Sequence, residues 1–270
     1  MPDTSPRYLA VLDFEATCED RRAENPDWDL AQQEIIELPV ALVDTEERRI
    51  VARFGRLIRP ERQPLLTPFC TQLTSIQQHE VDGQPTIADV MEEFAAWCED
   101  TGVRADNTLA VTCGDWDLMS MWPKQAAHVP GLETPALFKT WCNLKVIFKA
   151  ATGARKGFGM MGMLRRLKLP HQGHHHRGED DVTNIANIVL HLLGRGAVFR
   201  ATWTAQDRAR EHKRLSKKLR RVMHQLEERC AALESIPAGV PPDVGRHVQV
   251  QIDTLEAERV RLERYAEVFS

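Results

Sequence analysis

The stretch Tyr8-Leu-Ala-Val-Leu-Asp13-Phe14-Glu15 is a nearly continuous apolar run that ends in two acidic residues. The apolar part predicts a buried β-strand. Because residues i and i+2 of a strand point to the same face, Asp13 and Glu15 are expected to project together. Two carboxylates this close favour a cation between them, and Mg²⁺ prefers oxygen ligands. The alternative is that both acids are solvated at the end of the strand, and the Asp-x-Glu pattern alone does not separate the two interpretations.

Two further segments bring acidic residues to the end of a predicted element. A strand predicted at residues 109–112 leads into Cys113-Gly-Asp115-Trp-Asp117, and His176-Arg-Gly-Glu-Asp180-Asp181 leads into a predicted helix. Each segment alone is also explained as a turn or a helix N-cap. The run His174-His175-His176 is equally compatible with a polar loop or with transition-metal binding.

Taken together, the three segments match the requirements of two-metal phosphodiester hydrolysis. In that chemistry one divalent ion lowers the pKa of the attacking water, and the other stabilises charge on the leaving oxygen. A histidine suits the role of general base because its pKa lies near neutral pH.

The sequence around these segments predicts an α/β domain over residues 1–198. Residues 35–44 and 50–59 are predicted to form a strand hairpin, and residues 86–98 a helix with Thr86 as its N-cap. The glycine-rich residues 153–162 indicate a loop, and residues 180–193 carry the apolar periodicity of a helix.

Residues 199–270 differ in composition and predict an α-helical hairpin with coiled-coil-like packing. Its first helix carries eight Lys and Arg residues between positions 208 and 221, against the single acid Glu211. This cluster is compatible with RNA phosphate binding. It is also compatible with an ordinary solvated helix face, and dimerisation through the apolar stripe is a third alternative.

The bulk composition constrains the setting of the protein. The net charge of −4 gives no overall attraction to nucleic acid, so any such binding needs a local basic surface or bound cations. The six cysteines are irregularly spaced, which favours reduced thiols in a cytoplasmic protein. No signal peptide and no membrane-spanning segment are predicted.

Five blocks, in order, resemble the Eri-type 3′→5′ exoribonucleases of the DEDDh, or proofreading-exonuclease-like, superfamily. The resemblance covers about residues 7–195. The blocks are Asp13-Phe-Glu-Ala-Thr-Cys18, Glu34-Ile-Ile-Glu-Leu-Pro39, Leu66-Thr-Pro-Phe-Cys70 with Leu73-Thr-Ser-Ile76, Cys113-Gly-Asp-Trp-Asp-Leu118, and His176 to Asp181 with Asn184-Ile-Ala-Asn-Ile188.

This resemblance implies an RNase H-like fold with a central mixed five-stranded sheet, two Mg²⁺ or Mn²⁺ ions, and release of 5′-mononucleotides from the 3′ ends of single-stranded RNA or DNA. It implies that Asp13, Glu15, Asp117 and Asp181 bind the metal ions, and that His176 is the general base in its His-x4-Asp spacing. Asp115 is a weaker candidate than Asp117, and His175 and His174 are weaker candidates than His176. Phe14, the backbone at Ala16, and Ile76 match positions that contact the terminal nucleotide.

The sequence also departs from the family pattern. Ser75 stands where glycine is usual in the Leu-Thr-Gly-Ile block, so the turn there is expected to differ. No separate N-terminal nucleic-acid-binding domain is expected, unlike in the histone-mRNA branch, so substrate choice is expected to differ. The competing hypotheses are a non-catalytic RNA-binding or scaffold protein on a nuclease-like fold and a DNA-directed repair exonuclease.

Overall fold

The structure is a computed structural model that describes residues 5–20, 25, 28–155, 157–235 and 242–269. The chain divides into two compact units, Met1–Thr204 and Ala205–Ser270. The sequence predicted the boundary between these units after residue 198, a few residues earlier. Each unit is described by itself below.

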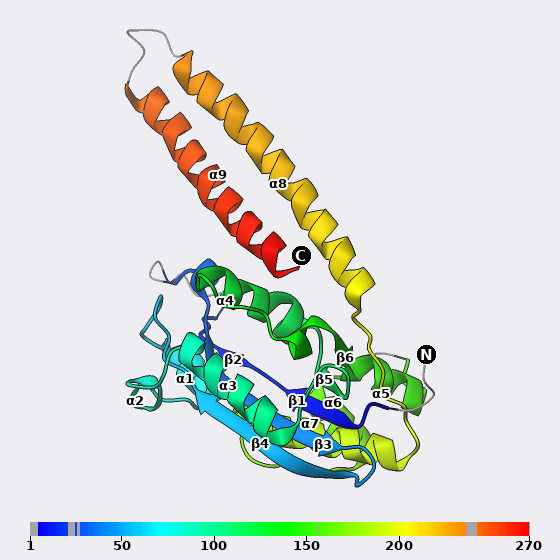
Figure 1. The fold of residues 1–270 in the computed structure, drawn as a ribbon. Coiled ribbons are helices and arrows are strands. Elements are labelled where there is room, and N and C mark those ends of the chain that lie inside the picture. The colour runs from blue at the N-terminus through cyan, green and yellow to red at the C-terminus, as the bar shows by residue number, and fades with distance from the viewer. Residues whose placement is uncertain (1–4, 21–24, 26–27, 156, 236–241, 270) are drawn as a thin grey trace. The chain divides into compact units, whose positions relative to one another are not determined.

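A mixed β-sheet forms the centre of the first unit, and its described residues make six strands (Figure 1). The strands are β1 (Tyr8–Leu12), β2 (Glu15–Ala16), β3 (Ile35–Asp44), β4 (Arg49–Leu57), β5 (Thr108–Thr112) and β6 (Trp141–Asn143). Strand β1 pairs antiparallel with β3 and parallel with β5, which in turn pairs parallel with β6. The predicted hairpin is confirmed, because β4 pairs antiparallel with β3. The predicted α/β architecture is likewise confirmed.

Strands β1 and β2 behave as one strand interrupted at Asp13 and Phe14. Both pair with β3: β1 lies opposite Val40–Asp44 of β3, and β2 lies opposite Ile35–Glu37. Strand β4 pairs with the other edge of β3 as a single strand, over Glu37–Asp44. The interruption between β1 and β2 explains the sixth strand, since the family resemblance implied five. Pro39 lies in β3 opposite the interruption, and a proline has no N–H to donate to a ladder.

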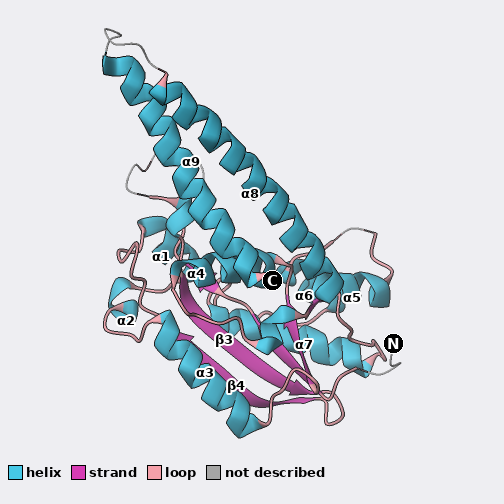
Figure 2. Ribbon diagram, turned by 45° about the horizontal axis from the view of Figure 1, so that its top comes forward, coloured by secondary structure: helices cyan, strands magenta, loops and turns pink. Residues whose placement is uncertain are grey.

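Helices cover both faces of the sheet (Figure 2). On one face, α5 (Leu144–Thr152), α6 (Met160–Leu167) and α7 (Gly178–Gly194) bury a continuous apolar core against β1, β3 and β5. On the other, α3 (Ile87–Thr101) packs Phe94 against Phe54 of β4 and Phe138. Shorter helical segments complete the unit: α1 (Pro68–Thr74), α2 (Gln78–Val81), α4 (Trp122–His128), the 3₁₀ turns Leu30–Gln32 and Ala136–Lys139, and the π-helical turn Asp117–Met121.

Local signals in the sequence account for several element boundaries. Thr86 caps α3 as predicted, and its hydroxyl and backbone N–H form a capping box with Asp89. Ser75 ends α1 in the left-handed region at φ 63°, a conformation that glycine adopts without strain. The loop predicted at residues 153–162 is too long, because α6 already begins at Met160. Strand β6 and helix α5 were not predicted.

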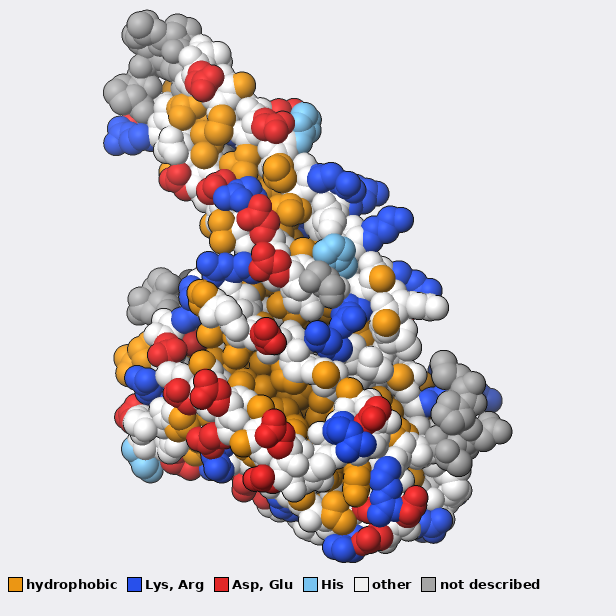
Figure 3. Space-filling view, viewed as in Figure 1, with side chains coloured by type: hydrophobic (Ala, Val, Ile, Leu, Met, Phe, Trp, Pro, Cys, Tyr) orange, Lys and Arg blue, Asp and Glu red, His pale blue; other side chains and the backbone are white. Residues whose placement is uncertain are grey.

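The second unit is the predicted helical hairpin of α8 (Ala205–Glu234) and α9 (Pro242–Val268). Residues 236–241, between the two helices, lie outside the described residues. Leu215, Val222 and Leu226 of α8 are buried, and Nζ of Lys218 pairs with Oε1 of Glu258 on α9 at 2.7 Å. Lys and Arg side chains gather on the side of α8 that faces away from α9 (Figure 3).

Among the helices that the structure describes, none is long and apolar enough to span a membrane.

Candidate active site

The interruption between β1 and β2 places Asp13 and Glu15 at the edge of a cavity of about 430 Å³. Carboxylate oxygens of Asp13, Glu15 and Asp181 lie within 4.8 Å of one another. Glu15 and Asp181 are buried, and Asp13 is partly exposed. The first and last acidic segments of the sequence therefore converge in space.

Asp117 joins this cluster from the end of β5. It begins the π-helical turn, is buried and lines the same cavity. The backbone N–H of Phe14 donates a hydrogen bond of 2.9 Å to Oδ1 of Asp117, which ties the β1–β2 interruption to the second acidic segment. Asp115 has a different environment, because its carboxylate accepts hydrogen bonds from Trp141 Nε1 at 3.0 Å and Asn143 Nδ2 at 2.8 Å. It holds β6 in place.

Two histidines contact Asp181 at the start of α7. Nδ1 of His175 lies 3.0 Å from Oδ2 of Asp181, and the backbone N–H of His176 donates to the same oxygen at 2.9 Å. The two imidazoles stack with ring centroids 3.9 Å apart, and both line the cavity. His174 is exposed, and its backbone N–H donates to Asp180. The described contacts thus bring His175 as well as His176 to the acidic cluster.

Glu37 is the residue that positions α7, and sequence reasoning gave it no role. Its buried carboxylate accepts hydrogen bonds from the backbone N–H groups of Gly178 at 2.9 Å and Glu179 at 3.2 Å. A carboxylate at a helix N-terminus satisfies N–H groups that have no partner within the helix and interacts favourably with the helix dipole. The approach is so close that a Cβ at position 178 would lie 3.0 Å from Oε2 of Glu37. A larger residue at position 178 would therefore force the Glu37 carboxylate, or the ring of Pro39 whose Cγ would lie 2.9 Å away, to shift.

The cluster contains more acidic groups than nearby positive charges, and the pKa values of three of its acids are raised. Burial raises the pKa of Glu15 to about 10, with the charges of Asp13 and Asp181 adding to the rise. Burial and the charges of Asp117 and Asp181 hold the pKa of Asp13 well above its usual range. Burial also raises the pKa of Asp117 to about 6, although the Phe14 N–H and Lys145 oppose the rise. The protein alone does not supply enough positive charge to keep these groups ionised.

The donor set fits divalent metal ions. Four carboxylates from three separate segments face one cavity, and hard divalent cations such as Mg²⁺ bind through carboxylate oxygens. A bound cation would offset the repulsion that raises these pKa values. Asp13, Glu15, Asp117 and Asp181 are the residues that would hold it.

The residues expected to contact a nucleotide lie in different places. Phe14 and Ala16 line the cavity, although the ring of Phe14 is only 3% exposed and packs edge-on against Phe138. Ile76 is fully buried in a small core cluster with Ile36 and is not among the residues that line the cavity. The left-handed turn at Ser75 directs it there, and Leu73 of α1 lines the cavity instead.

Trp116 is a second residue to which sequence reasoning gave no role. Its side chain is 44% exposed although it lines the cavity beside Asp117. The indole therefore offers an exposed aromatic surface beside the cluster of acids. Its place between Asp115 and Asp117 was the available signal.

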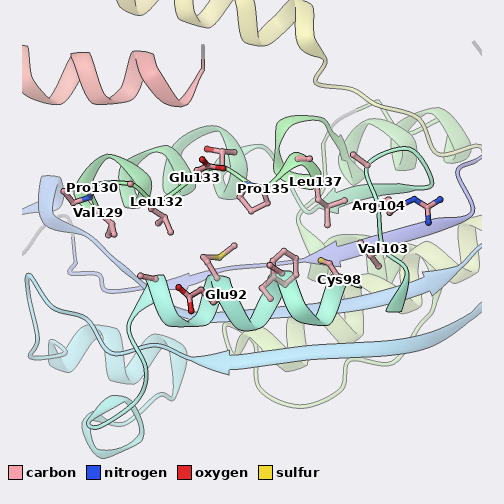
Figure 4. A pocket seen from close by; sticks show the side chains of 18 residues that line it. Glu92, Cys98, Val103, Arg104, Val129, Pro130, Leu132, Glu133, Pro135 and Leu137 are labelled. Carbon is pink, nitrogen blue, oxygen red and sulfur yellow. The ribbon is translucent and has the colours of Figure 1, made fainter. Parts of the chain in front are cut away.

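A larger cavity of about 580 Å³ lies elsewhere in the first unit, between α3 and residues 129–137 (Figure 4). Its lining is mainly apolar, with Glu92, Arg104 and Glu133 among the few charged residues. It contains none of the acids or histidines described above. The candidate active site is therefore the smaller, acidic cavity.

Comparisons with known proteins agree with this geometry. Residues 10–189 match the RNase_T family model, which is described as an exonuclease. The mouse (Mus musculus) ERI1 exoribonuclease 3 is 42% identical over 197 residues, covering 72% of this chain and 56% of that protein. The Drosophila melanogaster 3′-5′ exonuclease Snipper is 31% identical, covering 72% of each chain.

A solved structure shows the same likeness in three dimensions. The nuclease domain of 3′hExo, a DEDDh family member bound to rAMP, superposes with a TM-score of 0.67 at 30% identity, covering 75% of this chain and all of that one. The chain spans about 56% of the length of the mouse relative that it matches. Helices α8 and α9 lie beyond the residues matched by the family model.

Proposed function

Because this chain belongs to the RNase_T family of exonucleases, we propose that it is a metal-dependent 3′→5′ exonuclease that hydrolyses single-stranded RNA to 5′-mononucleotides. The family resemblance found in the sequence is thereby confirmed. RNA is favoured over DNA because relatives such as the mouse protein are named exoribonucleases.

The observation that carries this proposal is the convergence of three sequence segments on one cavity. Asp13 and Glu15 come from the β1–β2 interruption, Asp117 from the end of β5, and Asp181 from α7. A solvated strand end or a simple N-cap, the alternatives for each segment alone, does not require the others to be near. Their meeting beside two histidines is what metal-assisted phosphodiester hydrolysis requires.

The proposed roles of the acids follow from their chemistry. Asp13, Glu15, Asp117 and Asp181 would hold two Mg²⁺ or Mn²⁺ ions. When bound, such ions supply Lewis-acid activation of water and neutralise charge on the phosphate and leaving oxygen. Glu37 acts as a positioning residue, because it fixes the N-terminal turn of α7 that carries Asp181.

We assign the general base to His176. Its imidazole takes one proton from the attacking water, the water oxygen bonds to phosphorus, and the 3′ oxygen of the remaining chain leaves. Burial and the neighbouring His175 lower the pKa of His176, so the ring is neutral and able to accept a proton at neutral pH. His175 holds the carboxylate of Asp181 in place through its Nδ1.

The terminal nucleotide is proposed to contact Phe14 and the backbone at Ala16, with Leu73 beside them. Contact with Ile76 stays a prediction from the family resemblance. Trp116 is the additional candidate, because exposed aromatic side chains serve as stacking platforms for single-stranded bases.

Substitution Trp116→Ala should raise KM for single-stranded RNA about 10-fold and change kcat little, because stacking on an aromatic side chain contributes mainly to binding. Steady-state rates on an RNA oligonucleotide measure both values. Trp116→Phe keeps an aromatic surface and should stay close to the parent. An unchanged KM in the alanine variant would exclude stacking.

The proposed function is tested with RNA labelled at its 5′ end. The labelled strand should shorten stepwise from its 3′ end and release 5′-mononucleotides, stop in EDTA, and resume when Mg²⁺ or Mn²⁺ is restored. A DNA strand of the same sequence should be degraded more slowly. Undiminished activity in EDTA would contradict the mechanism. RNA binding without cleavage under Mn²⁺ would favour a non-catalytic protein, and faster degradation of DNA would favour a repair exonuclease.

Dimerisation through the helical hairpin stays a separate proposal. The main apolar stripe of α8 is already buried, so a second copy would have to contact exposed apolar residues of α9 such as Val250, which is 62% exposed.

A further inference from the structure

We propose that the outer face of α8 is a binding surface for the phosphate backbone of RNA. The surface consists of Lys213, Lys217, Arg220 and Arg221, which we call the basic strip. This inference rests on the proposed function for the identity of the bound polyanion. If the active site hydrolyses RNA, RNA is the polyanion that the chain is expected to meet.

The helix geometry places the basic strip on one side of α8. Successive residues turn by about 100° around an α-helix, so positions 213, 217 and 220–221 align along the axis. The buried residues Leu215, Val222 and Leu226 fall on the opposite side. All four cations are exposed, and Lys and Arg side chains line this side in Figure 3. The strip extends about 12 Å along the axis, which is long enough to meet several phosphates.

The basic strip is not neutralised by the rest of the hairpin. Three neighbouring cations of α8 have acidic partners: Arg210 pairs with Asp207, Arg214 with Glu211, and Lys218 with Glu258. Within the part of the chain that the structure describes, none of the four strip residues forms an ion pair. Four like charges within three turns repel one another and therefore destabilise an isolated helix.

The partner helix provides an internal comparison. In α9, Arg246 pairs with Asp243, Arg259 with Glu256 and Glu263, and Arg261 with Glu258. Helix α9 thus shows the mixed charge pattern expected of a solvated helix face, with opposite charges three or four residues apart. Helix α8 departs from that pattern over its basic strip.

The chemistry of the strip favours a nucleic acid over a membrane surface. A helix that binds at a membrane interface inserts an apolar face into the lipid. The main apolar face of α8 is already buried, and the positions between the strip cations include Ser216 and Leu219, neither of them an exposed large apolar residue. A polyanion needs only a row of accessible cations, and it binds through release of its counterions.

The charge distribution along the chain supports the same partner. Residues 208–221 carry eight Lys and Arg against one acid, whereas the remainder of the chain carries 27 against 38. The net charge of that remainder is therefore −11, so it offers a polyanion no overall attraction. The basic strip supplies a local attraction that the overall charge of −4 does not.

The test compares the full chain with the variant Lys213→Gln, Lys217→Gln, Arg220→Gln, Arg221→Gln. Binding of a fluorescent oligouridine long enough to span the basic strip is measured in EDTA, where no cleavage is expected. Each phosphate contact contributes about 0.7 to the slope of log K against log salt for a single strand, so losing four contacts should reduce that slope by about 2.8. Raising salt from about 50 to about 200 mM should then weaken the parent about 50-fold more than the variant.

A matched control removes the same charge from α9, through glutamine at Arg246, Arg259, Arg261 and Arg264. This control should keep nearly the full salt slope of the parent. Circular dichroism checks that both variants retain their helices. Equal losses in the two variants would assign the effect to net charge and overturn the proposal, and so would an unchanged slope in the strip variant.

Two further measurements distinguish a failure of this proposal from a failure of the proposed function. Hydrolysis of a dinucleotide, whose single phosphodiester is occupied in the active site during the reaction, should be the same in parent and strip variant. If the parent hydrolyses no RNA while the strip still binds it, the proposed function fails and the binding surface stands. If the parent bound phosphatidylserine vesicles, and the strip variant lost that binding but kept its binding to RNA, the strip would be assigned to membranes instead.

Discussion

Replacement of Asp13 by Asn is expected to lower the rate of RNA hydrolysis on the order of 10³-fold, because it removes one of the charges that would hold the divalent ions. The substitution preserves the size of the side chain. In the metal-free protein, burial and the neighbouring acids already raise the pKa of the Asp13 carboxyl group that it removes. We therefore expect the variant to unfold at a temperature no lower than the parent in EDTA. Single-turnover rates at saturating Mn²⁺ measure the loss.

The matched control for this prediction is Glu179→Gln. Glu179 is an exposed acid in the first turn of α7, two residues before Asp181, and it does not line the cavity. It should retain the activity of the parent within about 2-fold, as expected for a surface substitution away from the site. If Asp13→Asn were as active as this control, Asp13 would not be a ligand, and the metal site would have to be sought elsewhere.

The second large effect is expected at the histidine pair. Substitution His176→Ala should lower kcat on the order of 10³-fold, within the range that a general base contributes. His175→Ala should cost about 10-fold or less, because the Nδ1 of His175 is engaged with Asp181 and its role is to hold that carboxylate. No described residue forms a hydrogen bond with the imidazole of His176, which leaves its nitrogens available to water. Single-turnover kinetics at saturating metal compare the two.

The reverse order of effects would assign the base to His175. The third histidine of the run supplies the control, since His174 is exposed and its imidazole does not line the cavity. His174→Ala should therefore behave like the parent. A loss in all three variants together would indicate that the loop as a whole, and not one imidazole, supports activity.

Much of the fold and of the candidate site was predictable because the decisive signals are local. The apolar run before Asp13 predicts a strand from its own composition, and Thr86 predicts the start of α3 because its side chain caps the helix within three residues. The acids follow the same logic. Each lies at the end of an element whose periodicity is visible in the sequence.

The missed features depend on contacts that are distant in sequence. Glu37 sits in an apolar strand and looks like an isolated polar exception until α7 places two N–H groups against it. The interruption between β1 and β2 is set by pairing with β3, as are the separate registers on either side of it. Phe14 reaches the cavity edge for that reason, since in an unbroken strand it would point away from the acids.

The role of Glu37 also has a consequence for the order in which the acidic cluster is assembled. Asp13, Glu15 and Glu37 precede Gly178, Glu179 and Asp181 in the chain and are therefore synthesised before them. Until α7 docks, Glu37 lacks the N–H groups that satisfy its carboxylate, and the early acids face one another without the helix that completes their cluster. Chains emerge from the ribosome with the N-terminus first. A chain whose synthesis has not reached α7 therefore lacks both Asp181 and the N–H groups that satisfy Glu37, so the acidic cluster is complete only once α7 has been made and has docked.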